Sequence, residues 1–249
     1  MKNLNQNSIV IQILVQFNPN INIHNKGVLY SAPFLIKKIN QMKLIKPYFE
    51  IEPFNASLMM RNIEKAGRTC YKSEDKITND SADKFVEMLL SKGHESVIEH
   101  EKITVRIICD RGVSHELVRH RIASFSQEST RYCNYAKDKF GNELTFIIPT
   151  FMGDLSVEAF NIFNKGLRDI ENVYFTMLDG GAKPEEARAI LPNALKTEVV
   201  TTMNLRSWRH FFELRASKYA HPDIRKLAND LLKDFKANIP VIFDDIKGV

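Results

Sequence analysis

The chain has 249 residues, of which 44% are hydrophobic, with a formal net charge of +5 at pH 7, and this is ample for one globular domain of enzyme size. The positive charge suits an anionic ligand, whether a mononucleotide, a dinucleotide, a polyglutamylated cofactor or a nucleic acid, but charge alone does not separate these. No apolar run approaches the roughly 20 residues of a transmembrane helix, and three cysteines without a Cys-x-x-Cys pair indicate neither a zinc ribbon nor a disulfide framework, so we expect a cytoplasmic protein.

Residues 1–41 differ from the rest of the chain. They are rich in asparagine, their hydrophobic periodicity is weak, and they contain no cluster of residues that could carry chemistry. A strand over residues 9–17 is the only element that their pattern indicates. We therefore expect residues 1–41 to form a poorly ordered N-terminal extension and residues 42–249 to form the functional domain.

Apolar residues at helical spacing and alternating apolar and polar residues predict a succession of helices and strands. In chain order these are helices over 55–67 and 81–93, a strand over 102–110, a short helix through 115–118, a strand over 144–149, a helix over 156–180, a short helix over 184–191, a strand over 196–203, and helices over 205–217 and 223–235. The succession predicts an α/β (α+β) fold with a central mixed or antiparallel sheet flanked by helices. No Gly-x-Gly-x-x-Gly follows a predicted strand, so we do not expect a Rossmann fold.

The segment 93–100 contains two histidines and two glutamates, which invites a metal-binding interpretation. His94 and His100 are six residues apart and would lie about 240° apart around a helix. Zinc peptidases instead place two histidines four residues apart on one helical face. We therefore predict no metal site.

The most informative stretch runs from Arg119 to Arg131 and begins with Arg-His-Arg. Three consecutive cationic or potentially cationic side chains cannot share one helical face, so the triplet should lie where a helix ends and the backbone turns. Basic residues are favourable at that end of a helix. Hydroxyls, an amide, a carboxylate and a further arginine follow, which can bind phosphate and orient a heterocycle. The pattern favours a nucleotide pocket, and the alternative is a solvated charged loop.

A second cluster lies at residues 204–215. On a helix, Arg206 and His210 share a face, whereas Arg215 points to the opposite side, so one helix could serve two ligands. The apolar residues of this helix are predicted to be buried, namely Trp208, Phe211, Phe212 and Leu214.

The spacing Arg-His-Arg, seven residues, Ser, one residue, Arg resembles the signature of the flavin-dependent thymidylate synthases, and the resemblance extends from about Met42 to the C-terminus. Many members have Asn-Glu where this chain has Ser126-Gln127. The resemblance implies reductive methylation of deoxyuridine monophosphate (dUMP) to thymidylate by a methyltransferase. The implied carbon donor is 5,10-methylenetetrahydrofolate, and the implied hydride source is non-covalent FAD reduced by NADPH. It also implies a homotetramer with active sites shared between subunits.

The resemblance also implies roles for individual residues. The residues implied to bind dUMP are Glu116, Arg119, Gln127, Glu128, Ser129, Arg131, Arg188 and Arg215. The residues implied to bind FAD are Ser96, Arg119, His120, Arg121, Gln127, Asn204, Arg206 and His210. Arg215 is the implied catalytic residue, because it would stabilise the pyrimidine ring ionised at N3. No attacking nucleophile is implied, and Ser129 would serve as a nucleotide-binding hydroxyl.

Two other classes of protein stay open on the sequence. A nucleic-acid-binding module would also explain a basic chain in which arginine clusters alternate with aromatic residues. A structural or interaction protein is less favoured, because two arginine-rich clusters would then be desolvated without a ligand.

Overall fold

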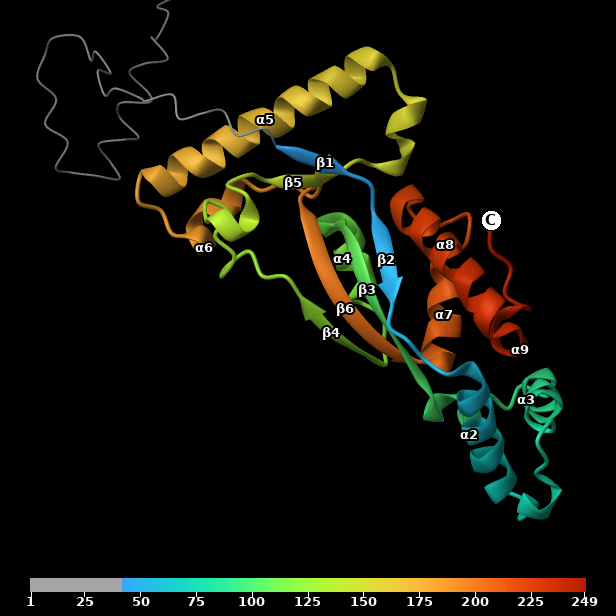
Figure 1. The fold of residues 1–249 in the computed structure, drawn as a ribbon. Coiled ribbons are helices and arrows are strands. Elements are labelled where there is room, and N and C mark those ends of the chain that lie inside the picture. The colour runs from blue at the N-terminus through green and yellow to red at the C-terminus, as the bar shows by residue number, and fades with distance from the viewer. Residues whose placement is uncertain (1–41) are drawn as a thin grey trace, which may run out of the picture. The chain divides into compact units, whose positions relative to one another are not determined.

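The structure is a computed structural model that describes residues 42–249 (Figure 1). The predicted N-terminal extension, with its strand over residues 9–17, lies outside the described residues. No helix among the described residues is both long enough and apolar enough to cross a membrane. The strands are β1 (Lys43–Ile45), β2 (Tyr48–Ile51), β3 (Lys102–Asp110), β4 (Ala123–Gln127), β5 (Thr145–Ile147) and β6 (Lys196–Asn204). The α-helices are α2 (Ala56–Thr69), α3 (Ala82–Ser91), α4 (Arg111–Leu117), α5 (Val157–Asp179), α6 (Pro184–Ala187), α7 (Leu205–Arg215), α8 (Pro222–Asn238) and α9 (Pro240–Phe243). The 3-10 helices are η1 (Glu74–Lys76), η2 (Glu95–His100), η3 (Asp138–Phe140), η4 (Thr150–Asp154) and η5 (Arg188–Ile190).

The main sheet has the strand order β2-β3-β6-β4 and is antiparallel throughout. Its centre is the long pair of β3 and β6, which are joined from Lys102 opposite Asn204 to Asp110 opposite Lys196. β1 and β5 form a separate parallel pair. The prediction of a mixed α/β fold with flanking helices is confirmed. The sequence did not predict β1, β2 and β4, which are only three, four and five residues long.

One face of the main sheet carries the larger hydrophobic core. The inward residues of β6 alternate with half-buried ones, as expected for a strand with one wet face. Helices α7 and α8 lie beside this sheet (Figure 1), and the aromatic rings of α7 are fully buried, as predicted. Leu214 was predicted to be buried but is 49% exposed. Helical spacing places it on the same face as Arg206 and His210, which are also exposed, rather than on the face of the buried rings.

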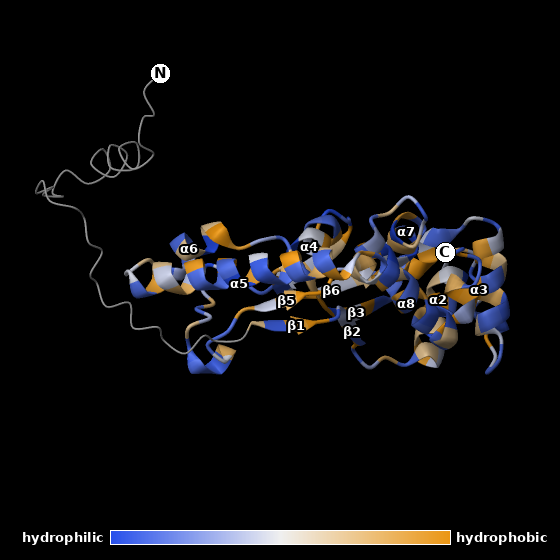
Figure 2. Ribbon diagram, turned by 90° about the horizontal axis from the view of Figure 1, so that it is seen from above, coloured by the Kyte–Doolittle hydropathy of each residue, from blue (hydrophilic) through white to orange (hydrophobic). Residues whose placement is uncertain are grey.

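A second, smaller core joins β5 to α5. Phe146 of β5 packs in one cluster with Leu167 and Tyr174 of α5. In Figure 2 the colour of α5 alternates between hydrophilic blue and hydrophobic orange along the helix, as expected when only one stripe is buried. The helix begins where the sequence predicts, because the Ser156 side chain accepts a hydrogen bond from the Ala159 N–H.

Two features of the fold position the arginine-rich stretch. Asp110, the last residue of β3, accepts a hydrogen bond from the Val113 N–H and so starts α4 directly after the strand. After α4 the chain returns as β4, which pairs with β6 from Ala123 opposite Met203 to Gln127 opposite Val199. The stretch is therefore a helix end, a turn and an edge strand, and not a loop throughout.

Candidate functional site

The Arg-His-Arg triplet lies at the C-terminal end of α4, which confirms the prediction that a helix ends there. The Arg121 guanidinium donates hydrogen bonds to the carbonyl oxygens of Val118, at 2.7 Å, and His120, at 2.8 Å. Carbonyl groups at this end of a helix lack helical partners and carry partial negative charge. Arg121 therefore stabilises the turn, and the side chain of Arg119 is exposed.

Arg215, the last residue of α7, reaches across to α4. Its guanidinium Nη1 forms an ion pair with the Glu116 carboxylate, and its Nη2 lies 3.4 Å from the Glu116 carbonyl oxygen. Its Nε lies 3.0 Å from Nε2 of His120. The side chain of Arg215 retains 21% exposure. The structure therefore joins three of the predicted residues, Glu116, His120 and Arg215, in one hydrogen-bonded cluster, in which the Arg215 side chain is not fully covered.

His120 is the most buried of the predicted site residues, with 6% exposure. Its ring contacts Phe211 edge-on, with centroids 5.1 Å apart, and lies 6.1 Å from the ring of His210. Burial, with the nearby Arg215 charge, lowers the pKa of His120 to about 4. The imidazole is therefore neutral over the physiological range.

The side chains of Gln127 and Glu128, at the other end of β4, form hydrogen bonds and an ion pair with residues of the same chain. The Gln127 amide donates to the hydroxyls of Ser114, at 2.9 Å, and Thr197, at 3.2 Å. The Glu128 carboxylate accepts from the Tyr135 hydroxyl at 3.0 Å and lies 2.8 Å from Lys196 Nζ. Burial and the adjacent Glu128 raise the pKa of Tyr135, so the phenol stays a donor. Both Glu128 carboxylate oxygens are thus engaged by side chains of this chain.

Ser129, Arg131 and Arg188 form a third group next to α6 and η5. Ser129 begins a tight turn in which its carbonyl oxygen accepts from the Cys133 N–H at 2.9 Å. Arg131 is exposed and forms an ion pair with Glu185 at 3.4 Å. Arg188 Nη1 lies 3.5 Å from the hydroxyl of Thr130. Two guanidinium groups therefore flank one turn, and their contacts are long.

The Arg215 cluster and the Arg131–Arg188 pair lie at opposite ends of β4. The five residues of this strand span on the order of 16 Å at about 3.3 Å per residue. The structure does not bring all the predicted dUMP ligands of one chain into a single cluster. It groups them as a set near the end of α7 and a set near the start of η5.

Apart from Gln127 of β4, the predicted flavin residues outside the triplet lie on η2, at the end of β6 and on α7. Asn204 caps α7 by accepting a hydrogen bond from the Ser207 N–H at 2.8 Å. Arg206 is exposed and pairs with Glu99, at 2.6 Å, and Glu95, at 3.5 Å. Ser96 and His210 are exposed nearby. Exposed cations, a hydroxyl and an imidazole are a donor set that fits an anionic dinucleotide cofactor.

The same ion pairs engage both glutamates of the segment 93–100, Glu95 and Glu99. Glu95 forms ion pairs with both Arg209, at 3.2 Å, and Arg206 of α7. Among the described residues, no three histidine, cysteine, aspartate or glutamate side chains come together as a set that could hold a metal.

Cys133 is the thiol closest in sequence to the signature. Burial, with the nearby Glu128 charge, raises the pKa of the Cys133 thiol. A thiol attacks as its thiolate, and a raised pKa reduces the thiolate fraction. The environment of Cys133 therefore disfavours nucleophilic attack, and it agrees with a site that works through arginines.

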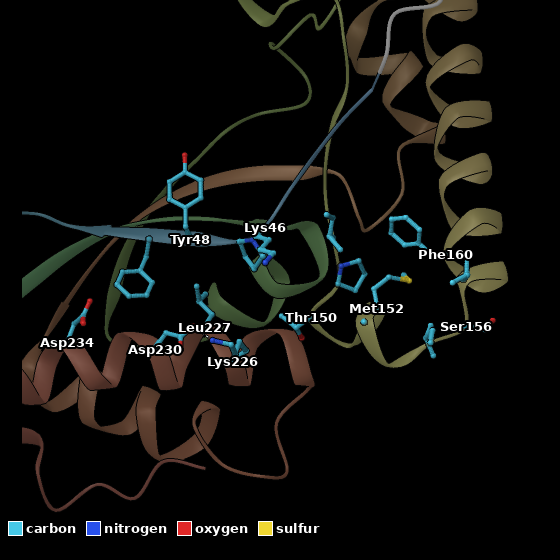
Figure 3. Close-up of a pocket in the computed structure, with 17 residues that line it drawn as sticks. Lys46, Tyr48, Thr150, Met152, Ser156, Phe160, Lys226, Leu227, Asp230 and Asp234 are labelled. Carbon is cyan, nitrogen blue, oxygen red and sulfur yellow. Dashed lines mark hydrogen bonds and ion pairs between the residues drawn. The ribbon is translucent and has the colours of Figure 1, made fainter.

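A cavity of about 980 Å³ lies elsewhere, between the β1–β2 segment, the segment 148–160 and α8. Figure 3 shows Met152 and Phe160 on one side and Leu227 of α8 on another. Its walls are mostly apolar, and Lys226 at its rim pairs with Asp230 at 2.5 Å. None of the predicted site residues lines this cavity. We locate the candidate site at the two arginine groups because they carry the charge that an anionic ligand requires.

Sequence reasoning missed the residues that hold the predicted ones in place. Glu185 pairs with Arg131 across 54 positions of the sequence, and Thr130 contacts Arg188 across 58. Lys196 likewise reaches Glu128 from β6. No local spacing encodes such contacts, because they depend on which elements pack together.

Comparisons with known proteins show the family of the chain. Residues 57–241 match the family model described as thymidylate synthase complementing protein. A flavin-dependent thymidylate synthase of Geobacter sulfurreducens is 36% identical over 189 residues, which cover 72% of this chain and 78% of that protein. One of Pyrococcus furiosus is 35% identical over 184 residues, which cover 74% and 72%.

Among solved structures, the UMP/dUMP methylase PolB from Streptomyces cacaoi, bound with 5-Br dUMP, has a similar fold. The TM-score is 0.68, and the match covers 82% of this chain and 96% of that one. At 23% sequence identity, this likeness supports the fold.

Proposed function

Because the chain belongs to the family of the thymidylate synthase complementing proteins, whose relatives are named flavin-dependent thymidylate synthases, we propose that it methylates dUMP to thymidylate. It is an enzyme of the methyltransferase class. In the proposed reaction, methylenetetrahydrofolate supplies the one-carbon unit and NADPH supplies the hydride through FAD. The observation that carries the proposal is the Arg215 cluster, a cation held in a fixed orientation and still open to a ligand.

The proposed role of Arg215 is electrostatic. A fixed guanidinium beside the uracil ring stabilises the form ionised at N3 and raises the electron density at C5, where the new bond forms. No enzyme nucleophile is then needed, in agreement with the raised pKa of the Cys133 thiol. Arg119 lies at the same end of β4 and supplies a further cation to the nucleotide.

Arg131 and Arg188 are the proposed phosphate ligands, together with the hydroxyl of Ser129, two residues before Arg131. Guanidinium groups bind phosphate with paired hydrogen bonds. Their polar contacts in this chain, Arg131 to Glu185 and Arg188 to Thr130, are long, and a phosphate can replace them. The Arg131 guanidinium also lies over the Tyr132 ring, 5.3 Å from its centroid.

We further propose that each nucleotide is held by two subunits of a homotetramer. The separation of the Arg215 cluster from the Arg131–Arg188 pair supports this, since the two ends of β4 can serve two different sites. The position of β4 at the edge of the sheet supports it as well, because the outer side of an edge strand is open to another chain.

FAD is the proposed cofactor, bound without a Gly-rich turn between strand and helix. The residues proposed to hold it are Ser96, Arg119, Arg121, Gln127, Asn204, Arg206 and His210. Among these, Arg206 and Arg121 carry the charge for the pyrophosphate. The chemistry that FAD supplies when bound is hydride transfer after reduction by NADPH. The chain's own part is to orient the cofactor and the nucleotide.

One experiment tests the reaction as a whole. The absorbance spectrum of the purified protein is recorded with FAD, then after anaerobic NADPH, then after dUMP and methylenetetrahydrofolate. We expect flavin bands that bleach with NADPH and return as thymidylate forms. A protein that takes up no flavin would contradict the proposal and would direct attention to polynucleotide binding.

A further inference from the structure

Arg215 has a partner whose role the proposed reaction leaves unexplained, the imidazole of His120. The distance from Arg215 Nε to His120 Nε2 is 3.0 Å. A guanidinium in a protein keeps its protons, so Arg215 is the donor and Nε2 is the acceptor. The imidazole is therefore neutral while the bond exists, with its proton on Nδ1.

Packing fixes the ring of His120 before any ligand binds. Its ring contacts the edge of the Phe211 ring, and its backbone N–H donates to the Leu117 carbonyl oxygen at 3.1 Å. With 6% exposure, the imidazole has little freedom to change its rotamer. A buried acceptor of this kind can set the direction of the guanidinium that binds to it.

The two groups that hold Arg215 differ in charge. Glu116 binds the guanidinium with a carboxylate, which offsets part of the positive charge. His120 accepts a hydrogen bond without carrying charge, so it orients Arg215 and leaves the cation intact. The titratable and charged groups near the imidazole are Arg215 and His210 of α7. Glu116 of α4 binds the same guanidinium.

We propose that His120 is a positioning residue, which holds Arg215 through Nε2 so that the free N–H groups of the guanidinium face the nucleotide. This inference rests on the proposed function. Arginine has five N–H donors, and three are engaged, one each on Nε, Nη1 and Nη2, so that two remain for a ligand. His120 then acts through Arg215, whereas the resemblance to the family implies a flavin contact.

The test compares His120→Leu with His120→Gln in the full-length chain, with His115→Gln as the matched control. Leucine removes the acceptor, and glutamine can place an amide oxygen near the position of Nε2. His115 is exposed on the same helix and belongs to neither arginine group. For each variant the measurements are bound FAD, kcat, KM for dUMP and the thermal unfolding midpoint.

We expect His120→Leu to lose about 10- to 100-fold in kcat, because a hydrogen bond to a charged group is lost. Bound FAD should stay within twofold of the parent protein, and His120→Gln should regain most of the kcat. A loss of FAD that is cured by saturating FAD would identify a flavin contact and overturn the inference. Equal losses of kcat in the two variants, with equally lowered midpoints, would identify a purely structural role and overturn it as well.

Nitrogen NMR separates this inference from the proposed function. In protein labelled with ¹⁵N in arginine and histidine, we expect a coupling between Arg215 Nε and His120 Nε2 that disappears in His120→Leu. The Arg215 signal is assigned by its loss in Arg215→Lys. Absence of the coupling in a chain that makes thymidylate would overturn the inference alone. A coupling in a chain that makes no thymidylate would instead overturn the proposed function.

Discussion

The two ends of β4 carry the same kind of residue in opposite settings. At the end near α7, Arg215 is held by Glu116 and His120 through contacts from three of its nitrogen atoms. At the other end, Arg131 and Arg188 make long polar contacts, at 3.4 and 3.5 Å, and the Arg131 guanidinium also lies over the Tyr132 ring. Arg131 is 52% exposed, against 21% for Arg215.

This difference matches two different tasks. A charge that must stabilise a developing anion is effective only if it already points the right way, because reorientation during the reaction would cost free energy. A guanidinium that binds a phosphate can reorient as the phosphate binds, because the two groups readily form paired hydrogen bonds. We therefore expect substitutions near α7 to lower kcat and substitutions near η5 to raise KM.

The largest expected effect is that of Arg215→Ala. Loss of one preorganised electrostatic group typically lowers turnover by 10²- to 10³-fold, and we expect about 10³-fold here with FAD still bound. Arg206→Ala should instead weaken FAD retention, because Arg206 lies on the exposed face of α7 with Glu95 and Glu99. Turnover and bound flavin, measured on both variants, check the comparison. If both variants lost flavin alike, the division of α7 into two functional faces would be wrong.

That division shows what the sequence could and could not establish. Helical spacing placed Arg206 and Arg215 on different sides of one helix, and in the structure they contact different partners. The end of α4 before the Arg-His-Arg triplet was also predicted correctly. The contact of Arg215 with His120 spans 95 positions and depends on how α7 packs against α4, so local pattern could not predict it. β4 was missed because its five residues, directly after the charged triplet, give only a weak local strand signal.

The next-largest expected effect is the pH dependence of the free energy of unfolding that comes from His120, at the Arg215 end of β4. The pKa of His120 is about 4 in the folded chain, against about 6.5 for an unperturbed histidine. The unfolded chain therefore takes up a proton first as the pH falls. Stability from this group is complete above pH 6.5 and is lost between pH 6.5 and 4, by up to about 3 kcal/mol at 1.36 kcal/mol per unit.

Denaturant unfolding at pH 7, 6, 5 and 4.5 measures this loss in the parent protein and in His120→Gln. The variant lacks the titrating group, so its free energy of unfolding should fall less steeply over this range. Carboxylates titrate in both proteins, and the difference between the two curves isolates His120. His115→Gln, at an exposed position of the same helix, should keep the steeper slope of the parent. Parallel curves for parent and His120→Gln would show that the imidazole is not held neutral by burial.

Arg131→Ala and Arg188→Ala test the end of β4 at which the arginines make long contacts. Each should raise KM for dUMP by about 10- to 100-fold, since hydrogen bonds to charged groups contribute about 1.5–3 kcal/mol. The kcat at saturating dUMP should change less than threefold, as expected when binding in the ground state and transition state is lost equally. Arg168→Ala, at an exposed arginine of α5, is the matched control. A large fall in kcat with unchanged KM would instead show that Arg131 and Arg188 stabilise the transition state, the role proposed for Arg215.

The smallest expected effect is that of Glu185→Gln, which removes the ion-pair partner of Arg131. The pair is 3.4 Å long and its side chains are 52% and 40% exposed, and pairs of this kind contribute at most about 1 kcal/mol. We expect the free energy of unfolding to change by less than about 0.5 kcal/mol. KM for dUMP should fall slightly, by less than threefold, because Arg131 becomes free to bind the phosphate.

Glu116→Gln makes the same chemical change at the Arg215 end of β4. There it should lower kcat, because the carboxylate orients Arg215. Equal responses to the two substitutions would mean that the two ends of β4 do not differ in the way their contacts indicate.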